Sequence, residues 1–176
     1  MNFARVYDIL NAARQRLFGW IRPLTQEEYT QQFPFGLRTL RATLIEIARV
    51  EHFYGKRLRE EPPPTWDDYP ISETRQPTFG DLERVWTALA GETRATLAGI
   101  TDWNHTVTRR IDQADKIIVS TATKADLATQ LLFHEVHHRA QAMAMLRQLG
   151  VEAQDLDYVH FAAKREEFPK DSLPRG

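Results

Sequence analysis

Leu131-Leu-Phe-His-Glu-Val-His-His-Arg-Ala-Gln-Ala-Met143 lies near the middle of a long helical pattern. Apolar residues and histidines recur there at spacings of three and four, which is the periodicity of one side of an α-helix. The recurring positions are Leu127, Leu131, His134, His138, Ala142, Met145 and Leu149. This pattern predicts a helix whose buried seam contains two histidines.

The two histidines of this seam need partners, because burying an imidazole nitrogen without one costs roughly 1–3 kcal/mol. His134 and His138 are four residues apart, so their side chains lie one helical turn apart and can converge on one point. Helices use this spacing to supply two ligands to a zinc-like ion. The spacing favours a metal site over the alternative, in which carboxylates or backbone groups satisfy both rings.

Composition limits the fold and the function. The chain has 176 residues, 42% of them hydrophobic, which is enough for one domain with its own core. The net charge is −1 and the basic residues are scattered, which gives no support to binding of nucleic acid or of a membrane surface. The absence of cysteine excludes disulfides and thiolate chemistry. Charges near the N-terminus and the lack of a long apolar run predict a cytoplasmic protein.

Three further helical patterns precede the histidine segment. They run from about residue 3 to 20, from Leu37 to Glu60, and from Phe79 to about Ile100. Capping boxes begin the third pattern at Thr78 and the histidine helix at Thr123, and Gly150 ends the latter. Four long amphipathic helices predict an all-α protein, an antiparallel four-helix bundle with long connections.

The connections between these helices contain shorter signals. Thr25-Gln-Glu-Glu28 has the form of a capping box and predicts a short helical turn. The prolines of residues 61–70 exclude a helix there. Two segments rich in β-branched residues, 106–110 and 116–120, flank a polar turn and predict a small β-hairpin before the last long helix.

The end of the chain is expected to pack back on the helices and then to become flexible. Leu156, Tyr158 and Phe161 supply the apolar contacts of the returning segment. Residues 1–163 are therefore expected to form one domain, and residues 164–176 a flexible tail.

The second helical pattern predicts which of its polar residues point inward. Its apolar side contains Glu51 at the centre and Glu46 at the flank, whereas His52 falls among the arginines and lysines. The two glutamates, rather than His52, are therefore the expected inward groups.

His134-Glu-Val-His-His138 also fits the pattern H-E-x-x-H, in which two histidines hold zinc and the glutamate, here Glu135, activates water. This interpretation predicts a metalloprotease-like hydrolase, with Asp155 and Asp157 as candidate third ligands. The chain lacks room for the substrate-binding sheet that such peptidases normally have, which disfavours it.

Three segments share a more extensive pattern: His134-Glu-Val-His-His-Arg-Ala-Gln141, Thr39-Leu-Arg-Ala-Thr-Leu-Ile-Glu-Ile-Ala-Arg-Val-Glu51 and Gln154-Asp-Leu-Asp-Tyr158. Together they resemble the DinB/YfiT-like metalloenzyme superfamily. The resemblance implies a four-helix bundle, often dimeric, that holds a divalent ion, commonly zinc or nickel, through three histidines from two helices.

Two of these family histidines correspond to His134 and His138, but Glu46 stands where the third is expected. A carboxylate can replace an imidazole as a ligand and leave coordination positions open to water or substrate. Such a set favours manganese or iron more than a set of imidazoles does. Zinc, nickel, manganese and iron therefore stay candidates. The alternative is that Glu46 only hydrogen-bonds the histidines and that metal binding has been lost.

Other residues near this site are expected to support it by hydrogen bonds, namely His137, Arg139 and Gln141. Glu51 and Glu135 are the candidates for a catalytic base, and no residue is assigned to an organic cofactor. The leading function is that of a small-molecule transferase or hydrolase, in which the ion activates water, a thiol or an alcohol. The alternatives are a stress-related metal-binding protein or a helical interaction protein, both without catalysis. A homodimer is the expected assembly.

Overall fold

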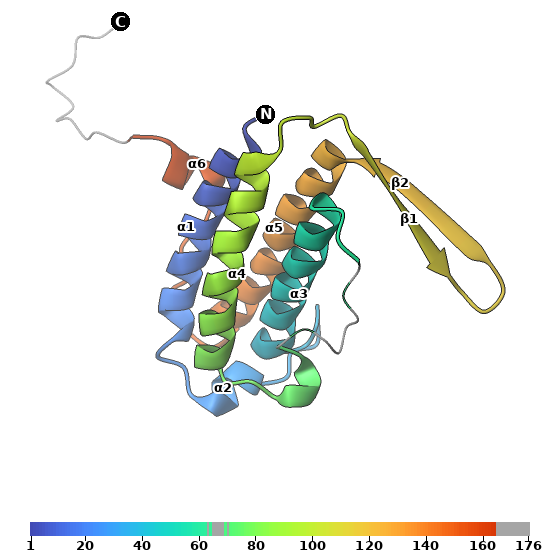
Figure 1. Ribbon diagram of the computed structural model, residues 1–176. Coiled ribbons are helices and arrows are strands. Elements are labelled where there is room, and N and C mark those ends of the chain that lie inside the picture. The colour runs from blue at the N-terminus through green and yellow to red at the C-terminus, as the bar shows by residue number, and fades with distance from the viewer. Residues whose placement is uncertain (63, 65–68, 70, 165–176) are drawn as a thin grey trace, which may run out of the picture.

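The computed structural model describes residues 1–62, 64, 69 and 71–164 (Figure 1). This part of the chain is mostly helical and has one small antiparallel sheet. Its elements are α1 (Phe3–Ile21), α2 (Gln26–Thr30), α3 (Leu40–Leu58), the 3₁₀ turn η1 (Glu73–Arg75), α4 (Phe79–Gly99), β1 (Thr106–Asp112), β2 (Ile117–Thr123), α5 (Lys124–Gln148) and α6 (Tyr158–Ala162).

The four long helices lie side by side (Figure 1). α3 packs along both α5 and α4, and α1 packs along both α4 and α5. Each long helix therefore turns its apolar side toward two long neighbours, and these sides bury the core. Its largest buried apolar side chains include Tyr7, Phe18, Leu44, Ile47 and Trp86.

Side chains cap the N-termini of the helices as the sequence predicts. Thr25, Thr78 and Thr123 each form a complete capping box, at the starts of α2, α4 and α5. α3 begins at Leu40 rather than at Leu37, because Thr39 is its cap and Arg38 has a φ of 70°, outside the helical region.

The predicted hairpin is present and projects away from the helices (Figure 1). Its register pairs Thr106 with Thr123 and Asp112 with Ile117. β2 runs directly into α5, and Thr123 is both the last residue of the strand and the cap of the helix.

The buried side of α5 contains Leu127, Leu131, Ala142 and Met145 of the predicted seam, but not its two histidines. Glu135 is 2% exposed and Arg139 is 5% exposed, whereas His134 and His138 are only half-buried, at the edge of this side. The prediction that the histidines occupy the buried seam is therefore wrong. Glu135 can enter the core in their place because Arg14 of α1 is its buried counter-ion.

The returning segment agrees only in part with its prediction. Leu156 is buried and Phe161 packs against the core, but Tyr158 is 41% exposed. Residues 165–176 of the expected tail, and most of the proline-rich stretch, lie outside the described residues. Within the described part of the chain, no helix has the length and apolarity that crossing a membrane requires.

Candidate metal centre

α3 and α5 place His134 between two other predicted ligands, beside Glu46 of α3 and His138 of its own helix. The Nε2 atom of His134 lies 3.8 Å from Oε1 of Glu46, and the rings of His134 and His138 are 4.4 Å apart between centroids. Glu46 lies at the flank of α3, as predicted, and is 33% exposed. As the side chains stand, no group of three or more His, Asp or Glu residues in the described part of the chain could hold a metal ion.

His134 has a nitrogen without a partner. Its Nδ1 atom is buried and forms no hydrogen bond with any of the described residues. Burial, together with the neighbouring His138 and His137, lowers the pKa of His134 to about 4. The ring is therefore neutral near pH 7, which is the form that binds a metal ion.

Gln141 orients His138 through a short chain of hydrogen bonds. Its Oε1 atom lies 3.0 Å from Nδ1 of His138, and its Nε2 atom donates to Nε2 of the exposed His137 over 3.1 Å. An amide oxygen can only accept, so Nδ1 of His138 donates this hydrogen bond. These contacts hold the His138 ring by its Nδ1 side and link it through Gln141 to His137.

The loop before α3 reaches Gln141 at Gly36. This glycine has a φ of +55°, and a Cβ atom there would lie 2.9 Å from Oε1 of Gln141. Glycine is therefore required for both the backbone conformation and the close approach.

We expect Gly36→Ala to lower the free energy of unfolding by about 1 kcal/mol or more. Because Gln141 must move away from His138, we also expect weaker binding at the metal centre proposed below. Gly150→Ala is the matched control, since Gly150 has a φ of +83° but no atom near the added methyl group. Urea unfolding and metal titration measure the two effects. Equal losses of metal affinity in both variants would contradict this role of Gly36.

The two glutamates considered as catalytic bases belong to a separate buried cluster around Arg14 of α1, which is 1% exposed. Nη2 of Arg14 donates to Oε2 of Glu135 over 2.6 Å and to Oε2 of Glu51 over 2.8 Å. The Tyr7 hydroxyl and Nε1 of Trp86 also donate to Glu51. Both carboxylates are therefore held in the interior by a cation, and their contacts do not support a role as general base.

Arg139 also lies away from the histidines. It donates to the backbone oxygens of Leu10 and Leu156, at 3.4 and 3.3 Å, and so ties α5 to α1 and to the returning segment. The sequence interpretation did not include Arg14. Its position seven residues after Tyr7, within the apolar stripe of the first helix, was the available signal.

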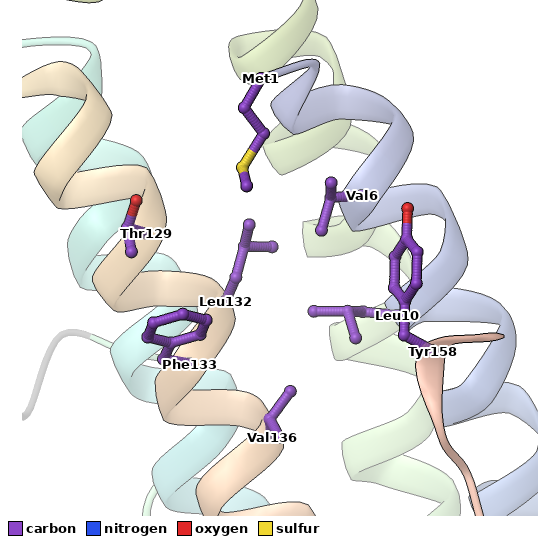
Figure 2. A pocket seen from close by; sticks show the side chains of 8 residues that line it. All are labelled: Met1, Val6, Leu10, Thr129, Leu132, Phe133, Val136 and Tyr158. Carbon is purple, nitrogen blue, oxygen red and sulfur yellow. The ribbon is translucent and has the colours of Figure 1, made fainter. Parts of the chain in front are cut away.

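An apolar pocket of about 500 Å³ lies between α1 and α5, apart from the three predicted ligands (Figure 2). Figure 2 shows Leu132 and Val136 of α5 on the side toward Val6 and Leu10 of α1, with Phe133 beside them on α5.

The sequence model of the DinB family matches residues 1–169. The chain belongs to the DinB family. The match includes the candidate ligands and Gln141, so the resemblance noted from the sequence is confirmed. Comparison with curated proteins found no match to this DinB-family chain.

Proposed function

We propose that this DinB-family protein is a metal-dependent enzyme, an antiparallel four-helix bundle that holds a divalent ion between His134, His138 and Glu46. The proposal rests on the distance of 3.8 Å between Nε2 of His134 and Oε1 of Glu46. The other ring nitrogen of His134, Nδ1, is buried and has no partner among the described residues. Two imidazoles and one carboxylate are a set that suits iron, manganese or zinc.

The residues present define what the site can do. When bound, a divalent ion supplies Lewis acidity that activates a water, thiol or alcohol nucleophile. Gln141 holds the His138 ring by its Nδ1 side, and Glu46 contributes a negative charge that offsets part of the charge of the ion. The partial exposure of His134 and Glu46 leaves room for a small molecule to approach. A transferase or hydrolase that acts on a small molecule fits these features best.

The second candidate is a stress-related metal-binding or helical interaction protein without catalysis. It is favoured by the contact between Glu46 and His134, which can exist without a metal ion, and by the ion pairs that engage Glu51 and Glu135. The metallohydrolase interpretation of H-E-x-x-H loses support, because Glu135 is bonded to Arg14 in the core rather than facing the histidines.

Elemental analysis of protein made without a histidine tag tests the proposal. We expect about one divalent ion per chain in the wild type, none in His134→Ala and less in Glu46→Ala. His105→Ala is the control, because His105 is exposed and pairs with Glu60 instead. A wild type that retains no ion, even after divalent metals are added, would contradict the metal centre.

An activity screen separates the two candidate functions. The metal-loaded protein is tested against small thiols with electrophilic acceptors and against hydrolysable esters. Turnover that is lost in His134→Ala supports the enzyme, and a bound ion without turnover supports the second candidate.

The apolar surface around the α1–α5 pocket supports the expected homodimer. Phe133 is 69% exposed, and Val136 and Tyr158 are each 41% exposed. Exposed apolar side chains gathered in one place commonly mark an interface. We propose that a second copy covers them, and a protein that stays monomeric at all concentrations in analytical ultracentrifugation would contradict this assembly.

A further inference from the structure

Two arginines near the base of the hairpin lack counter-ions among the described residues. Arg57, in the last turn of α3, and Arg109, in β1, line one cavity of about 270 Å³. The Nε atoms of both arginines and Nη2 of Arg57 are buried, and none of the three has a hydrogen-bond partner in the described part of the chain. A buried donor without a partner costs roughly 1–3 kcal/mol, and more when it is charged.

The carboxylates in the same cavity are engaged by other cations. Glu61 pairs with Lys56 over 3.1 Å and with Arg59 over 2.5 Å. Glu60 pairs with Lys124 over 2.9 Å and also contacts His105. The cavity therefore has an excess of positive charge, although two acidic residues line it.

The two guanidinium groups are close enough to influence each other. Burial lowers the pKa of Arg57, and the positive charge of Arg109 lowers it further. The guanidinium carbon of Arg109 lies 4.8 Å from the centre of the Phe53 ring, which holds this side chain against α3. Two neighbouring arginines without counter-ions that line a common cavity form an arrangement that suits the paired oxygens of an anion.

We propose that Arg57 and Arg109 bind a small oxyanion, the phosphate or carboxylate group of a small molecule. Such a group would be a counter-ion to both arginines and would offset the repulsion between them. The site is separate from the candidate metal centre, because Arg57 follows Glu46 by eleven residues, which is roughly 16 Å along the axis of α3. The proposal therefore stands whether or not a metal ion binds.

Calorimetric titration of the full chain with inorganic phosphate, and separately with succinate, tests the site and distinguishes the two chemistries. Each titration is matched to sodium chloride at the same ionic strength, which removes general salt effects. We expect the wild type to bind at least one of the two anions. Arg57→Gln and Arg109→Gln should each weaken that binding about tenfold or more, because each loses a charge-assisted hydrogen bond.

Arg110→Gln is the matched control on the same strand. Arg110 is exposed and pairs with Asp112, so its removal changes the net charge equally but leaves the cavity intact. We expect anion binding by Arg110→Gln to differ from that of the wild type by less than about twofold.

Two outcomes would overturn the site: neither anion binds to the wild type beyond the chloride control, or Arg110→Gln weakens binding as much as Arg109→Gln does. Arg109→Lys keeps the charge but not the planar fork, and it should bind more weakly than the wild type and more tightly than Arg109→Gln. It also tests the site if Arg57→Gln fails to fold, because Arg109 lies in the projecting hairpin.

Discussion

Arg14→Met is expected to lower the free energy of unfolding by about 3–5 kcal/mol, because removing one partner of a buried ion pair leaves the other charge uncompensated. Here two carboxylates, those of Glu51 and Glu135, would be left in the core without their shared cation. The guanidinium of Arg14 also lies 4.4 Å from the Trp86 ring, and this contact would be lost. Urea unfolding followed by circular dichroism measures the change.

Two comparisons identify the cause of that loss. Arg22→Met removes a half-exposed partner of Glu83 and should cost no more than about 1 kcal/mol. In the Arg14→Met background, Glu51→Gln and Glu135→Gln together should recover a large part of the stability, because the buried charges are then gone. An Arg14→Met variant that is no less stable than Arg22→Met would show that the buried pairs contribute little.

Glu46→His is expected to increase the affinity for zinc by at least about tenfold, or 1.4 kcal/mol, and to decrease that for manganese. The substitution would give three neutral imidazoles, which suit zinc and nickel, in place of a set containing a hard oxygen ligand. Competition with a chromophoric chelator measures both affinities. This expectation rests on the proposed metal centre.

Glu46→Gln is the matched control for this substitution. It removes the charge and supplies a poorer ligand, so the affinity for every divalent ion should fall. If Glu46→His and Glu46→Gln bind zinc equally, position 46 does not contribute a ligand and the three-residue site is incorrect.

Local signals in the sequence account for most of the secondary structure. The capping boxes at Thr78 and Thr123 give the starts of α4 and α5, since a cap depends only on residues within one turn. The predicted start of α3, Leu37, lies three residues before the observed start. The sequence pattern did not show this difference, because the positive φ values at Gly36 and Arg38 depend on how the preceding loop packs against Gln141.

The side of α5 that enters the core could not be predicted from its own periodicity. Moving the seam by one position exchanges His134 for Glu135, and both patterns have the helical period. The choice depends on Arg14, which is 121 residues away in the sequence. The common cavity of Arg57 and Arg109 could not be predicted either, because it forms only where the hairpin packs against α3.

The position of Arg14 has a consequence for the order in which the protein can fold during synthesis. α1 is translated before α3 and α5, and it carries a cation whose two partners lie on α3 and near the middle of α5. Before residue 135 is added, closing the interior would bury Arg14 beside one carboxylate only, with part of its donors unsatisfied. We therefore expect nascent chains that end before α5 to stay open and accessible to proteases, and the native interior to form only when α5 has emerged.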